Sequence, residues 1–218
     1  MYFLPISLAI FLLFLLLVPF LMFLLPAVAF AKLGLSPLAG LAFFFCCLAG
    51  SMINIPVYRK ELEYLEPVDE MTEFFNRFSG IRVPPVTERT IALNLGGAIL
   101  PGLLSFYLLS RIDPGPVVPA MLITALFAYH LSKPVKGVGI VIPAFIPPII
   151  AAVAALIFAE KADAPAVAYI SGVMGTLIGA DLLRLHQVKR FHISFLSIGG
   201  AGVFDSIFIV GIISVLLA

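Results

Sequence analysis

The stretch MYFLPISLAIFLLFLLLVPFLMFLLPAVAF, residues 1–30, contains no charged side chain and is apolar almost throughout. A helix of about 20 mostly apolar residues is long enough to cross the hydrocarbon core of a bilayer. A cleaved signal peptide would instead begin with basic residues and have an apolar core of about 7–15 residues. We therefore interpret this stretch as a retained membrane span.

The rest of the chain has the same character. Its 218 residues are 62% hydrophobic and 11% charged, with a net charge of +1. A soluble domain is about 45–50% apolar and about 25% charged. The composition therefore excludes a soluble enzyme, a disordered tail and a disulfide-rich secreted module. The small net charge provides no basic field for nucleic acid, so the expected partner is the lipid bilayer.

Seven apolar runs follow one another along the chain. Because they are continuous and do not alternate, they predict helices and not the strands of a barrel. The predicted fold class is an all-α, polytopic transmembrane helical bundle that forms one membrane domain over residues 1–218. Two spans fall within residues 1–56, two within 90–132 and three within 133–218. The predicted spans are 4–30, 35–55, 91–110, 117–132, 138–159, 165–183 and 195–217.

One connection between the predicted spans is long and charged. Residues 57–89 hold 12 of the 25 charged side chains in the chain. Apolar residues recur at helical spacing between Asp69, a candidate N-cap, and Gly80, a candidate helix end. This pattern is typical of an amphipathic helix on the membrane surface. A solvated loop with a single helical turn is the alternative.

Lysine and arginine are unevenly distributed among the connections. Ten of these residues follow the second, fourth and sixth predicted spans, whereas the first, third and fifth are followed only by Lys32, Arg111 and Lys161. Positive residues are enriched in cytoplasmic loops. The bias therefore predicts a multi-pass protein of the cell membrane, with the N-terminus and the 57–89 connection in the cytoplasm.

The chain also contains an internal similarity. LAGSMIN at 48–54 is similar to LIGADLL at 177–183, and NLGGAILP, which begins at Asn94, is similar to SIGGAGVF, which begins at Ser197. Spans one to three therefore resemble spans five to seven, and the fourth span joins two parallel copies. Such a three-plus-one-plus-three plan is known from transporters built of parallel repeats.

Two acidic residues lie inside predicted spans, Asp181 near the end of the sixth and Asp205 early in the seventh. An aspartate inside a bilayer is costly and is a functional candidate by default. If glycines delay the seventh helix to about Val203, both carboxyls lie at a similar depth on the cytoplasmic side. Such a pair suits shared-proton catalysis or proton-coupled transport. Separate ion or substrate contacts, or structural roles such as an Asp181–Arg184 pair, are the alternatives.

The glycine segments 96–98 and 199–201 have two interpretations. Small residues allow helices to pack closely, and unwound backbone can line a cavity. Asn54 and Asn94 are either hydrogen-bonding residues between helices or ligands of a substrate. The candidate substrate-binding residues are Asn54, Asn94, Ser197, Gly199, Gly200 and Gly202.

Three other features bear on the fold or on a possible site. The segment PVKGVGIVIPAFIPP, residues 134–148, contains four prolines and two glycines. It predicts either a broken or re-entrant start of the fifth span, or a loop followed by a kinked helix. The three histidines have no accompanying carboxylate cluster, so neither a metal nor another cofactor is predicted. Adjacent Cys46 and Cys47 have the character of small buried hydrophobic residues.

Several motifs resemble those of an uncharacterised family of prokaryotic multi-pass membrane proteins, namely NLGGAILP at 94–101, LIGADLL at 177–183 and SIGGAGVFD at 197–205. This resemblance covers most of the chain and implies no established activity. More distantly, the chain is similar to the presenilin and signal-peptide-peptidase group of intramembrane aspartyl proteases. Those proteins carry one aspartate on an inward-running helix and a second, after Gly-x-Gly, on the next outward-running helix. Asp181 and Asp205 match that arrangement, although GAGVFD replaces the Gly-x-Gly-Asp motif.

The leading hypothesis is an intramembrane aspartyl-type protease in which Asp181 and Asp205 hydrolyse membrane-embedded peptides. The glycines at 199–202 would admit water and the substrate backbone. The alternative is a proton- or ion-coupled carrier of a small solute, with the same aspartates as protonation sites and with Asn54 and Asn94 completing the cavity. A scaffold protein, the third reading, would need neither carboxylate.

Overall fold

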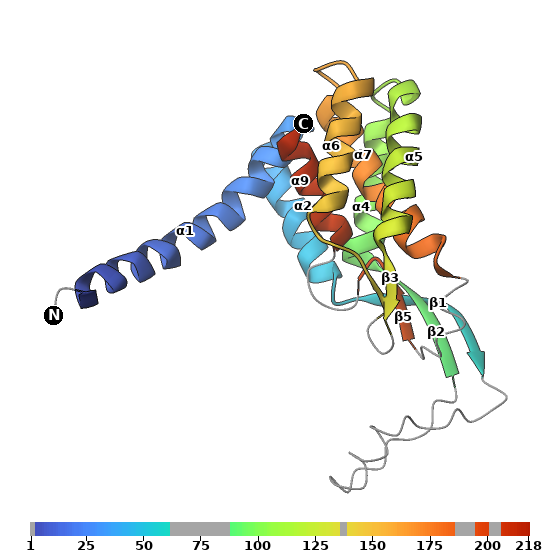
Figure 1. The fold of residues 1–218 in the computed structure, drawn as a ribbon, viewed down its shortest axis with the longest axis horizontal. Coiled ribbons are helices and arrows are strands. Elements are labelled where there is room, and N and C mark those ends of the chain that lie inside the picture. Colours follow the sequence, from blue (N-terminus) through green and yellow to red (C-terminus); the bar gives the residue numbers. More distant parts are fainter. Residues whose placement is uncertain (1–2, 62–87, 136–138, 186–194, 201–205) are drawn as a thin grey trace, which may run out of the picture.

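The computed structural model describes residues 3–61, 88–135, 139–185, 195–200 and 206–218. Helices make up most of these residues, and strands gather at one end of the helical bundle (Figure 1). The segment between Asp69 and Gly80 with its predicted amphipathic helix lies outside the described residues. Gly202 and Asp205 also lie outside them.

Each of the seven predicted spans contains a helix. Local sequence explains two of the helix starts. Ser36 caps the helix that begins at Pro37, and Asp113 caps the helix that begins at Pro114, and in both a proline occupies the first turn. The helices are α1 (Phe3–Lys32), α2 (Pro37–Gly50), the π-helical turn η1 (Leu95–Ile99) with α4 (Leu100–Leu109), α5 (Pro114–Leu131), α6 (Ile146–Phe158), α7 (Ala164–Thr176) with the π-helical turn η2 (Leu177–Leu182), and α9 (Ser206–Leu217).

Three helical segments are long and apolar enough to cross a membrane, namely Ser7–Lys32, Pro114–Leu131 and Ala164–Leu182. The other apolar helices of the described residues have 10–17 residues. At 1.5 Å per residue, such helices are shorter than the roughly 30 Å hydrocarbon core. Three of the seven predicted spans are therefore supported as candidate membrane spans by helix length and composition.

The predicted helical bundle is confirmed in that the fold is mostly helical, but the fold is not all-α, because the described residues also contain five short strands. They are β1 (Asn54–Glu61), β2 (Glu88–Asn94), β3 (Lys133–Val135), β4 (Gly139–Val141) and β5 (Phe195–Ile198). Four of them overlap the ends of predicted spans 35–55, 91–110, 138–159 and 195–217. Short runs of Ile, Leu and Val suit a strand as well as a helix, and Pro56 is unfavourable inside a helix.

The strands form two small sheets. In the larger, β2 lies between β1 and β5, antiparallel to β1 and parallel to β5. Asn54 is opposite Asn94, and Ala92 is opposite Ser197. The parallel pairing of β2 with β5 is the relation that two parallel copies of one repeat would have, and the repeat itself stays a prediction.

The proline-rich segment 134–148 does not start the fifth helix where predicted. Strands β3 and β4 pair antiparallel, and α6 begins only at Ile146. Pro147 and Pro148 then occupy the first turn of α6, where their missing N–H groups are not needed for helical hydrogen bonds. The expected helix start at residue 138 is therefore eight residues too early, and strands β3 and β4 precede α6.

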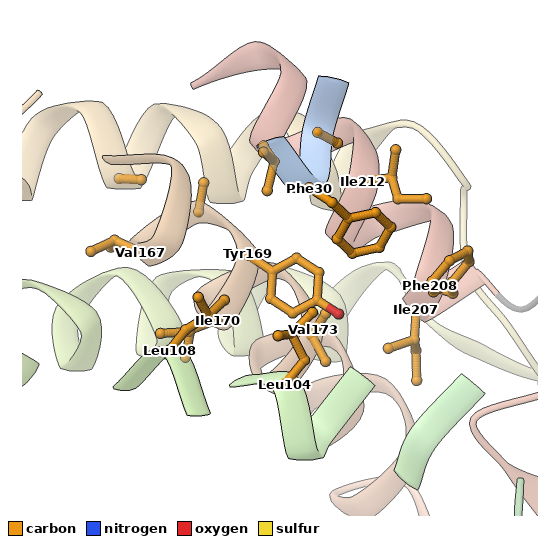
Figure 2. Close-up of a cluster of buried hydrophobic side chains, with 14 of the residues drawn as sticks. Phe30, Leu104, Leu108, Val167, Tyr169, Ile170, Val173, Ile207, Phe208 and Ile212 are labelled. Atoms are coloured by element: carbon orange, nitrogen blue, oxygen red, sulfur yellow. The ribbon is translucent and has the colours of Figure 1, made fainter. Parts of the chain in front are cut away.

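Helix α7 lies at the centre of the bundle and packs against α4, α5, α6 and α9. Small residues allow the close approach of α5 and α7. A Cβ atom added to Gly175 would lie 2.7 Å from Thr124 Cβ, and one added to Gly179 would lie 2.1 Å from Ala125 O. Figure 2 shows the core around Tyr169 of α7, with Leu104, Phe30 and residues of α9 beside it.

Helix α1 differs from the others. Its last turns pack on the bundle, where Ala29 and Phe30 are buried and the Lys32 ammonium donates to the carbonyls of Val215 and Leu216 at the end of α9. Its first half extends away from the other helices (Figure 1), and its apolar side chains from Leu8 onward are exposed. An apolar, unpacked helix of this kind is compatible with a lipid environment.

Candidate functional site

The candidate site lies where the three-stranded sheet meets the ends of the helices. Asn94 is the last residue of β2 and the residue before η1. Its side-chain Oδ1 accepts a hydrogen bond of 2.8 Å from the Gly97 N–H, which is the capping interaction expected at a helix start. The glycine segment 96–98 therefore opens a helix, and the side chain of Asn94 fixes that opening.

Asn94 also ties two other segments together. Its Nδ2 donates to the Ser51 carbonyl, just after α2, at 2.7 Å and to Asn54 Oδ1 at 3.1 Å. The side chain is 1% exposed, and both of its N–H groups are used. A fully engaged, buried amide of this kind holds the architecture together, so the geometry favours a positioning role for Asn94.

Asn54 is the meeting point of the polar cluster. Its Oδ1 accepts from Asn94 Nδ2 and, at 2.5 Å, from Ser197 Oγ of β5. Three of the residues predicted to bind substrate therefore form one hydrogen-bonded chain across β1, β2 and β5. The residues are 40 and 143 positions apart in the sequence. We call Asn54, Asn94 and Ser197 the amide cluster.

The two glycine segments have different backbones. Gly96 packs against the end of α2, since an added Cβ would lie 1.9 Å from Cys47 O and 2.4 Å from Ser51 N. Gly199 has a φ of +80° and Gly200 a φ of +140°, which are conformations that glycine adopts at no steric cost. At Gly96 the close-packing interpretation agrees with the structure, and at Gly199 and Gly200 the backbone is unwound, while the cavity of the second interpretation stays a prediction.

Asp181 lies in η2, at the end of the central helix, and is partly buried. Its Oδ2 accepts a hydrogen bond of 3.0 Å from the Gly199 N–H. An added Cβ on Gly199 would lie 2.4 Å from Ala98 Cβ and 2.7 Å from Ala98 N. The turn after β5 therefore binds the Asp181 carboxyl through its backbone. The same turn packs against Ala98 of η1, the helical turn that follows Asn94.

Arg184 interacts with α5. Its Nη2 donates to the Tyr129 carbonyl at 2.6 Å, its Nε donates to Ser132 Oγ at 3.2 Å, and its guanidinium lies over the Tyr129 ring, 4.4 Å from the centroid. The hydrogen bond described for the Asp181 carboxyl comes from the Gly199 N–H, and the Asp181–Arg184 pair stays a prediction.

The structure brings together five of the eight predicted site residues, namely Asp181, Gly199 and the amide cluster, and Gly200 follows directly. Asp205 and Gly202 lie outside the described residues, so the predicted proximity of the two aspartates stays a prediction. Ser206, the neighbour of Asp205, is the first residue of α9. Among the described residues, no group of three or more His, Cys, Asp or Glu side chains is arranged to hold a metal ion.

Sequence reasoning missed two buried hydroxyl groups on α7. In the described residues, Tyr169 Oη and Thr176 Oγ1 have no hydrogen-bond partner. A signal was available, because Tyr169 is an aromatic residue with a polar end within an apolar predicted span. The hydrogen bonds of Arg184 to Tyr129 and Ser132 were also missed, because the sequence suggested only a neighbouring carboxylate, Asp181, as its partner.

Comparisons with known proteins give a family and no activity. The family model described as "Protein of unknown function (DUF1614)" matches residues 48–217, which includes the amide cluster and both aspartates. No curated protein and no solved structure matches the chain. The predicted similarity to an uncharacterised family is confirmed by this match, whereas the similarity to intramembrane aspartyl proteases receives no support from it.

Proposed function

The chain belongs to the DUF1614 family of proteins of unknown function, and we propose that it is an integral membrane hydrolase of the aspartyl type that cleaves membrane-embedded peptides. In this proposal Asp181 and Asp205 form the catalytic pair. The protein is a multi-pass protein of the cell membrane, with the sheet on the cytoplasmic side. The bias of Lys and Arg towards the connections at that end supports this orientation.

The hydrogen bond from Gly199 N–H to Asp181 Oδ2 is the observation that supports the proposal most strongly. It joins the end of α7 to the segment that leads, six residues later, to Asp205. Six residues reach about 20 Å at most when fully extended. The contact therefore limits how far apart the two aspartates can lie, and it fixes the rotation of the Asp181 carboxyl.

The proposed reaction uses the pair as base and acid. One carboxylate accepts a proton from water as the water oxygen attacks the peptide carbonyl, and the other carboxyl polarises that carbonyl. The C–N bond then breaks, and the leaving nitrogen receives a proton from the pair. The products are a carboxylic acid and an amine, so atoms and charge balance without a cofactor.

The neighbouring elements have supporting roles in this proposal. Gly199 and Gly200 allow the turn whose backbone N–H binds the Asp181 carboxyl, because glycine adopts a positive φ at no steric cost. The amide cluster of Asn54, Asn94 and Ser197 holds β1, β2 and β5 in register, and this register places Gly199 beside Asp181. Substrate would contact the turn at Gly199 and Gly200, whereas the amide cluster would hold this turn in position.

The proposal is tested by cleavage of a transmembrane reporter peptide in proteoliposomes. Asp181→Asn keeps the size of the side chain and removes its proton chemistry, so cleavage should fall by about 100-fold or more. Asp113→Asn is the matched control, because Asp113 also accepts a backbone N–H at 3.0 Å, from Gly115, and lies at the start of α5. Unchanged cleavage by Asp181→Asn would exclude the catalytic role.

A proton-coupled carrier of a small solute is the second candidate. It is supported by the two buried hydroxyls of α7, Tyr169 Oη and Thr176 Oγ1, which have no hydrogen-bond partner among the described residues and lie on the helix that leads into η2 and Asp181. Proteoliposomes with a trapped pH-sensitive dye would report proton movement on addition of candidate solutes. Proton movement that is lost in Asp181→Asn while the wild type cleaves no reporter would favour the carrier over the hydrolase.

A further inference from the structure

We propose that the end of the bundle at which α5 and η2 finish binds the phosphate of an anionic phospholipid. Lys133 and Arg184 supply the positive charge, and an exposed apolar face of α5 supports the acyl chain. The site uses the membrane location of the proposed function and neither aspartate of the proposed catalytic pair. It can therefore be tested, and can fail, independently of the hydrolase activity.

Arg184 is fixed beside the last turn of α5, next to which η2 packs (Figure 1). Its guanidinium donates to the Tyr129 carbonyl at 2.6 Å and to Ser132 Oγ at 3.2 Å, and it lies 4.4 Å from the centroid of the Tyr129 ring. These three partners are uncharged, so the contacts orient the guanidinium without cancelling its charge. The planar fork of N–H groups on arginine matches the geometry of a phosphate.

Lys133 brings a second positive charge to the same place. It directly follows Ser132, the hydroxyl partner of Arg184, so the Cα atoms of the two neighbours are about 3.8 Å apart. Lys133 is exposed and is the first residue of β3, whose pairing with β4 holds its backbone. A lysine side chain is long and flexible. Its ammonium can therefore meet a phosphate that also contacts Arg184.

The face of α5 that leads to this basic pair is apolar and exposed. Val118, Leu122 and Leu126 follow one another at four-residue spacing and are 50%, 60% and 57% exposed. Tyr129 comes three residues after Leu126 and seven after Leu122, so it lies on the same face of the helix. An apolar strip suits an acyl chain, and tyrosine and basic residues at its end suit the head-group level of a bilayer.

The sequence gives this end of the helices an excess of positive charge. The stretches 129–145 and 182–204, which follow most of α5 and most of η2, contain neither Asp nor Glu but have five basic residues, Lys133, Lys136, Arg184, Lys189 and Arg190. At the opposite end, the connections 110–116 and 159–165 contain more acidic than basic residues, namely Arg111 and Lys161 with Asp113, Glu160 and Asp163. Charge complementarity therefore favours an anionic lipid at the first end alone.

The direct test measures lipid retention by the purified full-length chain in a neutral detergent. Equal amounts of phosphatidylglycerol and phosphatidylcholine are added, and native mass spectrometry counts the bound molecules of each. The wild type should retain phosphatidylglycerol in preference. Lys133→Gln keeps most of the side-chain length and removes the charge, so it should lower phosphatidylglycerol retention about fivefold and leave phosphatidylcholine unchanged. Equal retention of the two lipids by the wild type would overturn the proposal.

The opposite end of the bundle provides matched control variants. Lys161 is exposed, as Lys133 is. The Arg111 guanidinium lies 4.4 Å from the centroid of the Tyr107 ring, which is the arrangement that Arg184 has with Tyr129. Lys161→Gln and Arg111→Gln should retain phosphatidylglycerol as the wild type does. A loss in either control as large as in Lys133→Gln would show attraction to any basic residue and would contradict a defined site.

Two further arms separate charge, folding and the acyl chain. Arg184→Gln should also lower phosphatidylglycerol retention, and its melting temperature is measured because the variant removes the hydrogen bonds to α5. The exposed position 133 decides the result if Arg184→Gln does not fold. Glycerol 1-phosphate has the phosphate without acyl chains and should not displace phosphatidylglycerol. Displacement at equal concentration would indicate a site for free phosphate and would contradict the role of the α5 face.

Discussion

Two segments with nearly the same letters, NLGG at 94–97 and SIGG at 197–200, have different structures. Each includes the end of a strand, and the two strands, β2 and β5, lie side by side in parallel. After Asn94 the chain continues directly into the helical turn η1. After Ile198 it turns through Gly199 and Gly200, both with positive φ. The first segment joins a strand directly to a helix, whereas the second forms a turn next to the Asp181 carboxylate.

The difference shows that glycine serves two purposes in this fold. At Gly96 it allows the backbones of η1 and of the end of α2 to touch, and no positive φ is involved. At Gly199 it allows a turn whose N–H points to Asp181. The polar residues that precede the glycines, Asn94 and Ser197, both donate to Asn54 Oδ1. One acceptor therefore links the two segments.

The largest effect is expected at Gly96. In Gly96→Ala the new Cβ would lie 1.9 Å from Cys47 O and 2.4 Å from Ser51 N. These are backbone atoms that cannot rotate away, so the free energy of unfolding should fall by about 4 kcal/mol or more. Denaturant unfolding in detergent measures this. Gly102→Ala is the control, because nothing lies within 4 Å of its added Cβ, and it should be neutral or slightly stabilising.

Gly199→Ala should have the next largest effect. Its φ of +80° is unfavourable for alanine by about 1–2 kcal/mol, and its Cβ would lie 2.4 Å from Ala98 Cβ. A total loss of about 3 kcal/mol is expected, together with loss of the proposed cleavage. The double variant Ala98→Gly, Gly199→Ala should recover only the part of the loss that comes from the Ala98 side chain, because the backbone N of residue 98 still lies 2.7 Å from the added Cβ. Full recovery would show that the backbone conformation carries no cost.

Asn94→Ala should cost about 2–3 kcal/mol, because it leaves the Gly97 N–H and the Ser51 carbonyl without their partner. Thermal unfolding in detergent reports the loss. Asn94→Asp is informative as a companion, since it keeps the acceptor for Gly97 and removes the donor for Ser51 and Asn54. It should therefore be destabilised as well, and equal stability of Asn94→Asp and wild type would contradict the assigned hydrogen bonds.

Ser197→Ala should have the smallest effect. It removes one hydrogen bond to Asn54 and leaves Asn94 to occupy the same acceptor. A loss of about 1 kcal/mol is expected. An equal loss of stability in Ser197→Ala and Asn94→Ala would mean that both segments contribute equally to the stability of the fold. That result would contradict the contrast between the two segments.

The sequence allowed the helical part of the fold to be predicted, because every long apolar run contains a helix. It did not reveal the strands, since Ile91 and Leu93 fit an apolar helix as well as a strand until their partner β5 is known. The members of the amide cluster were predicted as site residues. Their mutual contacts could not be predicted, because they depend on how strands pair whose residues lie up to 143 positions apart in the sequence. The positive φ of Gly199 agrees with the unwound backbone that was one of the two interpretations of the glycine segments. Tyr169 was missed although its hydroxyl lies in an apolar run, because the sequence does not show whether a hydrogen-bond partner lies near it.

The central claim is that Asp181 and Asp205 lie together in one site. Cysteines placed at both positions, in a chain with Cys46 and Cys47 changed to serine, can be tested with a short thiol cross-linker in native membranes. The Asn54→Cys, Ser197→Cys pair is the positive control, because the side chains of these residues are in hydrogen-bond contact. We predict cross-linking of the aspartate positions as efficient as that of the control. No cross-linking there, with an efficient control, would contradict the shared site and with it the proposed catalytic pair.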